Sequence, residues 1–136
     1  MHGNHKKELN ILKTLKKYIK LIPSDTKENT LCLTIGYSLG GYNWYNGDSE
    51  RRGYYLYCSP CNRETKKLND GKEYTTVTET LGKGAKVLLK EVTRQSKKSE
   101  TEAVEIAYQK ECMLINLVVE KYGLKLAEVQ EAAKYE

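Results

Sequence analysis

The repeat of apolar side chains changes after Gly82, and this change limits the folds that the chain can adopt. Before Gly82, three segments alternate along the chain or are rich in β-branched and aromatic residues, which is typical of strands. These segments are residues 31–37, 53–60 and 74–80. Because Asn46-Gly47 favours a tight hairpin turn, we expect an antiparallel meander in this half of the chain.

Beyond Gly82, apolar residues recur every three or four positions, as in helices. We expect a first helix over residues 84–98 and a second over residues 100–122. Ser99 and Glu102 form a capping box at the start of the second helix, and Gly123 is suited to end it. The second helix carries two adjacent apolar stripes, which is more than one contact with a sheet needs. We therefore expect a homo-oligomer, and a wide intramolecular core is the alternative.

Residues 5–22, HKKELNILKTLKKYIKLI, predict an amphipathic helix that Pro23 ends. Its lysine face suits solvent, and a helix lying on a membrane surface is the alternative. The predicted fold class is α+β, with a small antiparallel β-sheet in the N-terminal half, two long C-terminal helices and an extra N-terminal helix. We expect an amphipathic helical extension over residues 1–29 and a single ligand-binding domain over residues 30–136.

The chain has 136 residues, which suits one compact domain, and no apolar run approaches the ~20 residues of a membrane span. Its first residues, MHGNHKKELN, lack the apolar core and cleavage site of a secretory signal. We therefore expect a cytoplasmic protein that does not bind membranes. The formal net charge of +5 mildly favours an anionic partner.

The four cysteines are too few and too scattered for a secreted disulfide framework. Cys58-Ser-Pro-Cys61 has the spacing of half a zinc ribbon, but the sequence has no second pair to complete it. Structural thiols are the favoured interpretation, and a metal site or a redox pair are the alternatives. We expect no metal and no cofactor.

Residues 40–55, GGYNWYNGDSERRGYY, are the first candidate for ligand binding. Tyr42 and Trp44 offer flat rings that stack on bases, and Arg51 and Arg52 can form bidentate bonds with phosphate. The alternative is that tyrosines form the core of a chain that has no phenylalanine. The second candidate is a basic stripe on the helix expected after Gly82, which faces either water or an anion. The stripe consists of Lys83, Lys86, Lys90, Arg94 and Lys97.

The sequence contains no motif that assembles a catalyst. Its only histidines are His2 and His5, and it has neither a phosphate-binding loop motif nor a dinucleotide fingerprint. No combination of nucleophile and base can be assembled from the rest of the chain. We therefore expect binding without turnover, and no enzymatic activity.

Three successive segments resemble the phage Thoeris anti-defence proteins of the first described type. They are IGYSLGGYNWYNG, RRGYYLYCSP and GKGAKVLLKEVTRQSKK, and the resemblance spans residues 31–122. It implies a small sheet followed by helices, a symmetric oligomer, and sequestration of glycocyclic ADP-ribose without cleavage. Some members also hold cyclic oligonucleotides at a separate site. The CSPC pair and the N-terminal extension depart from the family pattern and leave the oligomer arrangement open.

The resemblance implies a phage protein that works as a sponge for a cyclic nucleotide immune signal in the host cytosol. Four basic residues would hold the pyrophosphate, three aromatic residues would offer a stacking face for adenine, and one amide would read its edge. They are Arg51, Arg52, Lys90 and Arg94, then Trp44, Tyr42 and Tyr54, and finally Asn43. The alternatives are a small basic single-stranded nucleic-acid-binding protein and a phage inhibitor that acts by protein–protein contact.

Overall fold

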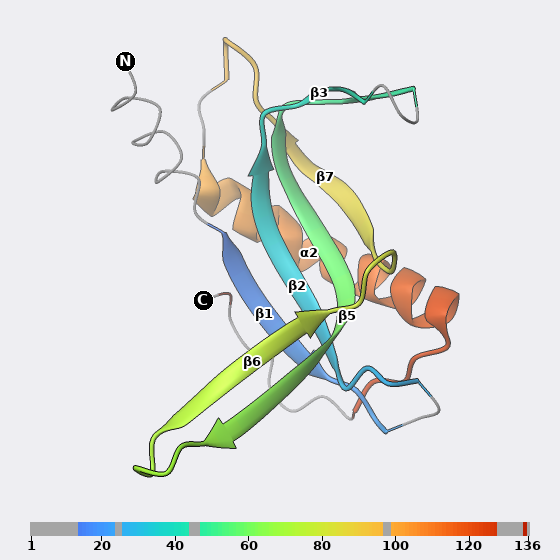
Figure 1. Ribbon diagram of the computed structural model, residues 1–136. Coiled ribbons are helices and arrows are strands. Elements are labelled where there is room, and N and C mark those ends of the chain that lie inside the picture. The colour runs from blue at the N-terminus through green and yellow to red at the C-terminus, as the bar shows by residue number, and fades with distance from the viewer. Residues whose placement is uncertain (1–13, 24–25, 44–46, 97–98, 128–134, 136) are drawn as a thin grey trace.

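A computed structural model describes residues 14–23, 26–43, 47–96, 99–127 and 135. This part of the chain is mostly β-sheet, with a single helix across one face of the sheet (Figure 1). The predicted fold class, a small sheet with two long C-terminal helices and an N-terminal helix, is therefore wrong. Two of the segments that were expected to be helical pair with neighbouring strands instead.

The main sheet is antiparallel and five-stranded, and its strand order is β1-β2-β5-β6. Its strands are β1 (Leu15–Lys20), β2 (Thr30–Ser38), β5 (Gly53–Lys67), β6 (Glu73–Glu79) and β7 (Ala85–Glu91). The long strand β5 organises the sheet, because β2 pairs with one of its edges while β7 and β6 follow one another along the other. A separate two-stranded hairpin consists of β3 (Gly41–Asn43) and β4 (Asp48–Glu50).

The helix expected over residues 84–98 is wrong, because Ala85–Glu91 form β7. The apolar spacing of this segment fits both the helical repeat of three or four residues and the strand repeat of two. Val87 and Leu89, for example, are two positions apart, which suits one face of a strand. β5 decides between the two, since an unpaired edge along Gly53–Cys58 would leave backbone groups unsatisfied beside the core. Strand pairing supplies those hydrogen bonds, and a helix would not.

The N-terminal helix expected over residues 5–22 is also wrong in its described part, because Leu15–Lys20 form β1 and pair with β2. Residues 1–13 lie outside the described residues. Leu15 and Ile19 pack against the core, but the position between them is Lys17, whose side chain is only 5% exposed. A lysine at a core-facing position interrupts the alternation, and this interruption hides the strand from a sequence pattern.

The second predicted helix is confirmed as α2 (Glu100–Tyr122), and so are both of its caps. The Ser99 hydroxyl accepts a hydrogen bond from the Glu102 amide, and Gly123 has the left-handed backbone of a C-cap. One face of α2 packs against β2, β5 and β7 with the side chains of Ala103, Ala107, Leu114, Ile115 and Val118. Met113 and Leu117 from the predicted wide face are more than half exposed, and a homo-oligomer stays a prediction.

The polar connection predicted over residues 62–73 is largely strand, because β5 continues to Lys67 before a turn at Asp70-Gly71. The strand predicted over residues 74–80 is confirmed as β6. Together, residues 62–79 form a two-stranded β-arm that extends beyond the end of β2 (Figure 1). Every residue of β6 is exposed, so the β-arm contributes little to the core.

Candidate ligand-binding site

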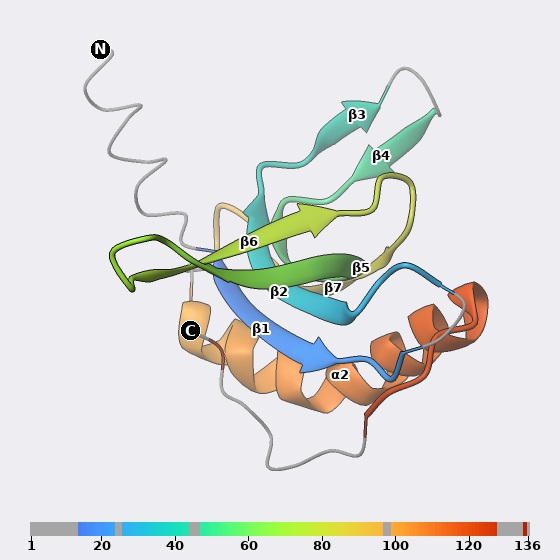
Figure 2. The same ribbon diagram turned by 60° about the horizontal axis from the view of Figure 1, so that its bottom comes forward.

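Among the described residues, α2 covers one face of the main sheet and no helix lies on the opposite face (Figure 2). Side chains alternate along a strand, so Leu56 and Cys58 of β5 face the core while Tyr55 and Tyr57 face the other way. Thr34 of β2 lies opposite Tyr57 on one side, and Lys86 of β7 lies opposite it on the other. Three strands that are distant in sequence therefore bring a hydroxyl, a ring and an ammonium group together.

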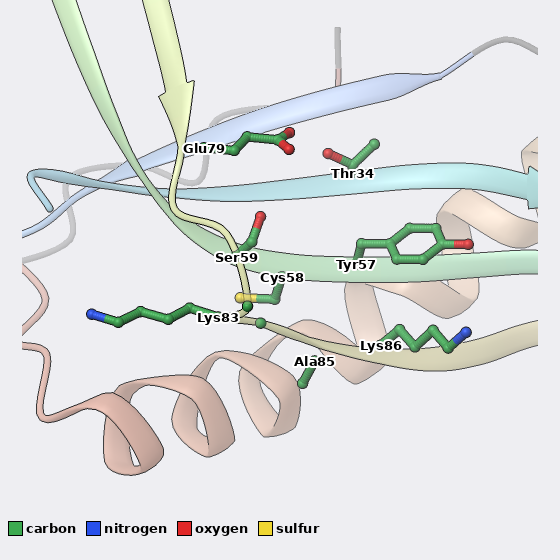
Figure 3. A pocket seen from close by; sticks show the side chains of 10 residues that line it. Thr34, Tyr57, Cys58, Ser59, Glu79, Lys83, Ala85 and Lys86 are labelled. Atoms are coloured by element: carbon green, nitrogen blue, oxygen red, sulfur yellow. The ribbon is translucent and has the colours of Figure 1, made fainter. Parts of the chain in front are cut away.

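A pocket with a volume of 530 Å³ lies at this place, within the size range of small-molecule sites. It is lined by Thr34, Tyr57, Cys58, Ser59, Glu79, Gly82, Lys83, Gly84, Ala85 and Lys86 (Figure 3). The side chains of Tyr57 and Lys86 run in the same direction, whereas Lys83 extends the opposite way (Figure 3). The pocket thus combines one aromatic ring with two lysine ammonium groups and the carboxylate of Glu79.

The turn between β6 and β7 shapes one wall of the pocket. Gly84 has a φ of +144°, and a Cβ atom there would lie 3.0 Å from the carbonyl oxygen of Cys58. Only glycine permits this close approach without strain. The Gly84 amide also donates a 2.9 Å hydrogen bond to the hydroxyl of Tyr122, at the end of α2. The wall is therefore anchored to the helix on the far side of the sheet.

Each lysine of the pocket already has a carboxylate partner. Lys86 is hydrogen-bonded to Glu50 of β4, and this bond lowers the pKa of Glu50 and raises that of Lys86. Lys83 lies 2.8 Å from Glu28, whose side chain is only 4% exposed. The Lys83 hydrogen bond outweighs burial and lowers the pKa of Glu28. Each ammonium group is thus positioned by a carboxylate, and the bond to Glu50 favours the charged form of Lys86.

Tyr55 and Tyr57 lie side by side on the face of the sheet opposite α2. The rings of Tyr55 and Tyr57 lie 6.1 Å apart in a tilted arrangement, and the Lys86 ammonium lies 5.4 Å from the centre of the Tyr55 ring. Tyr55 is buried and donates a 2.8 Å hydrogen bond to the Arg51 carbonyl, whereas Tyr57 is partly exposed. Burial, and then the nearby Glu50 carboxylate, raise the pKa of Tyr57, so its phenol is neutral. Tyr57 is therefore the ring that a ligand can reach.

The predicted basic residues lie outside the pocket. Arg51 forms a 3.1 Å ion pair with Glu91, and Lys90 pairs with Glu102 of α2. Arg52 and Arg94 are exposed. The Val92 amide donates to the Arg52 carbonyl at 2.9 Å, which brings the segments that carry the two arginines together at one end of the sheet. The three arginines thus lie on connected segments at one end of the sheet, and none of them lines the cavity.

The predicted aromatic residues are dispersed. Tyr54 is only 5% exposed and packs edge-on against Tyr37, with 5.1 Å between ring centres, so it belongs to the core and offers no stacking face. Tyr42 is 51% exposed on β3. Trp44 and the side chain of Asn43 lie outside the described residues. The prediction thus selected the inward-facing tyrosine of β5, whereas Tyr57 is the one that faces the pocket.

Several lining residues were absent from the predicted ligand-binding set: Thr34, Tyr57, Ser59, Glu79, Lys83 and Lys86. The two lysines belonged to the basic stripe, but the helical interpretation gave them the wrong neighbours. Had residues 85–91 been interpreted as a strand, Lys86 would have paired across the sheet with an outward-facing residue of β5. The sequence therefore contained the information that places Lys86 beside β5, but the helical interpretation of residues 85–91 did not use it.

All four cysteines are free thiols, and Cys32, Cys58 and Cys61 are buried. Burial raises the pKa of Cys58 to about 12 and that of Cys61 to about 11, so both thiols are protonated at neutral pH. Among the described residues, no three histidine, cysteine, aspartate or glutamate side chains are grouped as they would be around a metal ion. These thiols pack as apolar groups in the sheet.

No protein-family model matches the chain, and neither a curated protein nor a solved structure is significantly similar to it. Within the described residues, no helix has the length and apolarity needed to cross a membrane.

Proposed function

We propose that the protein binds a cyclic nucleotide immune signal without cleaving it and acts as a phage anti-defence sponge in the host cytosol. The ligand would be glycocyclic ADP-ribose or a related cyclic oligonucleotide. The observation that carries the proposal is the 530 Å³ pocket, in which a reachable tyrosine ring lies beside a lysine ammonium. A ring and a cation are the two groups that a compact nucleotide needs.

Tyr57 would stack on the base, an interaction worth ~1–3 kcal/mol. Lys86 would hold a phosphate as a point charge, and Lys83 would take a second anionic group at the other end of the pocket. The hydroxyls of Thr34 and Ser59 can bind the ribose or the edge of the base. Arg51, Arg52 and Arg94 lie too far along the sheet to line this cavity, and would attract the anion over a longer range.

The charge of the β-arm favours a compact ligand over a polynucleotide. A protein that holds single-stranded nucleic acid carries a basic groove along the strand. The β-arm has as many acidic as basic side chains: Arg63, Lys66, Lys67 and Lys72 against Glu64, Asp70, Glu73 and Glu79. The most extended surface of the molecule is therefore balanced in charge and does not form a basic groove.

The chemistry of the pocket favours binding over turnover. Cys58 borders the pocket, but its side chain is buried in the core and burial raises the pKa of its thiol, so it is a poor nucleophile, because the thiolate is the reactive form. The hydrogen bond to Glu50 raises the pKa of Lys86, and a cationic ammonium cannot act as a base. We expect the ligand to leave the protein unchanged.

The test is calorimetric titration of the purified chain with glycocyclic ADP-ribose, followed by heat denaturation and analysis of the released ligand. We expect tight binding and recovery of intact ligand. Tyr57→Ala should weaken binding about 5- to 150-fold, the equivalent of the lost stacking. Tyr74→Ala, which removes a 42% exposed tyrosine from the β-arm, is the matched control and should bind as the wild type does.

Three outcomes would contradict the proposal. Recovery of a cleaved product would indicate an enzyme. Equal affinities of the Tyr57 and Tyr74 variants would place the ligand outside the pocket. Absence of binding to cyclic nucleotides, together with a salt-dependent shift of a labelled oligonucleotide, would favour the single-stranded nucleic-acid-binding alternative.

A further inference from the structure

The β3–β4 hairpin is attached to the rest of the molecule in an unusual way. Its two strands pair with each other and, within the described part of the chain, with no strand of the main sheet. It connects to β2 through residues 39–40 and to β5 through residues 51–52. Figure 2 shows it on the side of the sheet opposite α2. Backbone pairing therefore does not fix its position, and side chains have to.

Glu50 supplies that fixation. This last residue of β4 accepts a 2.7 Å hydrogen bond from the Ser38 hydroxyl through Oε2 and another from the Lys86 ammonium through Oε1. The Ser38 hydroxyl in turn accepts a 3.1 Å hydrogen bond from the Gly40 amide. One carboxylate thus ties the base of the hairpin to the ends of β2 and β7.

The same ammonium lines the pocket. A phosphate that approaches Lys86 finds it already neutralised by a carboxylate, which is an anion of similar hydrogen-bonding geometry. The side chains of Lys86 and Glu50 are 50% and 31% exposed, so water and ions reach the pair. Exposed ion pairs of this kind contribute little to stability and are easily exchanged.

We propose that Glu50 is an internal competitor for the phosphate subsite, and that a bound phosphate replaces its carboxylate at Lys86 and loosens the β3–β4 hairpin. This inference rests on the proposed function, because it assigns the phosphate of that ligand to Lys86. Occupancy of the pocket is thereby coupled to the position of the hairpin. The hairpin can then reorganise around the ligand, since Gly40 and Gly41 at its start have φ values of +74° and +135°.

The alternative arrangement is that Lys86 keeps Glu50 and binds the ligand with another of its N–H groups, since an ammonium has three donors. In that case Glu50 orients Lys86, and its removal should weaken binding. The two arrangements therefore predict opposite changes in affinity, and only exchange of partners predicts that a ligand releases the hairpin.

The experiment compares the wild type with Glu50→Gln and with the control Glu73→Gln. Glu73 is also a glutamate at a strand end, with a 57% exposed side chain, but its partner Lys67 lies on the β-arm at 3.8 Å. We expect Glu50→Gln to bind glycocyclic ADP-ribose about two- to fivefold more tightly, the equivalent of losing one exposed ion pair. Glu73→Gln should leave the affinity unchanged.

Hydrogen exchange provides the second readout. In the wild type, ligand should speed amide exchange in residues 47–52. In Glu50→Gln, exchange there should already be fast, and ligand should add nothing. Unchanged or weaker binding by Glu50→Gln, or wild-type exchange that ligand does not speed, would overturn the inference and leave the proposed function standing.

Inorganic pyrophosphate separates the two proposals. It carries the phosphate chemistry without a base, so it should release the hairpin even if the cyclic nucleotide is not the natural ligand. If glycocyclic ADP-ribose does not bind but pyrophosphate speeds exchange in the wild type only, the proposed function fails and the competition at Lys86 stands. If neither anion binds, both fail.

Discussion

Exchange of Glu111 for glutamine is expected to destabilise this fold strongly, although the residue is far from the pocket. Both carboxylate oxygens of Glu111 on α2 accept hydrogen bonds from the Lys17 ammonium of β1, at 3.1 and 3.2 Å. The side chains are 12% and 5% exposed, and the ammonium lies 5.5 Å from the ring centres of Tyr108 and Tyr135. This is a buried ion pair with two aromatic neighbours.

The expected loss in the free energy of unfolding follows from the Lys17 charge, which Glu111→Gln leaves without an ionic partner. Removing one partner of a buried ion pair costs about 3–5 kcal/mol, because the remaining charge stays desolvated. Glutamine retains one acceptor and the two rings stay in place, so we expect the lower end, about 3 kcal/mol. Typical small proteins are stable by ~5–15 kcal/mol, so this is a large fraction of the total.

Urea unfolding followed by circular dichroism measures the effect. With a denaturant slope of about 1–3 kcal/mol/M, the unfolding midpoint should fall by about 1–3 M. Glu105→Gln, a change at an exposed position of the same helix, should move it little. The double variant Lys17→Met with Glu111→Leu should recover most of the loss, because replacing both charges by apolar groups leaves none unpaired. A loss below about 1 kcal/mol in Glu111→Gln would refute the reasoning and indicate that water reaches the pair.

Two further predictions concern acid stability and assembly. Glu28 has a pKa below its ordinary value of 4.5, chiefly because Lys83 donates a hydrogen bond to it. It therefore stabilises the fold above pH 4.5, and the contribution is lost as the pH falls through the lowered pKa. Glu28→Gln should be less stable at pH 7 and show a smaller loss in acid; equal acid slopes in urea unfolding would contradict this. Copies that associate through the exposed side chains of Met113 and Leu117 should separate in Leu117→Asp, and light scattering would then give a lower mass. An unchanged mass would show that copies do not associate through this face of α2.

The sequence alone was sufficient to predict α2 and β6. Ser99, Glu102 and Gly123 act within one or two turns of the helix ends, so their effect does not depend on the rest of the fold. β6 is rich in β-branched residues and follows directly after the Asp70-Gly71 turn. Both elements depend on contacts between residues that are near one another in the sequence.

The strands predicted over residues 31–37 and 53–60 are also present, as β2 and the first part of β5, whereas tertiary structure decided β1 and β7. Residues 85–91 fit either period, and the unpaired edge of β5 made them a strand. The strand β1 was hidden by Lys17, which is tolerated beside the core because Glu111, 94 residues away, pairs with it. A local pattern cannot show a partner at that distance, so the lysine was interpreted as a solvent-facing residue of a helix.

The candidate site was decided in the same way. The aromatic and basic residues along the chain predicted a ligand with a base and phosphate groups. Which tyrosine of β5 meets the ligand depends on which face α2 covers: it buries Tyr54 and leaves Tyr57 within reach. The pocket itself exists only because β2, β5 and β7 pair side by side, which brings together the hydroxyl of Thr34, the ring of Tyr57 and the charge of Lys86. Side-chain chemistry is therefore readable along the chain, whereas the juxtaposition that makes a site depends on long-range strand pairing.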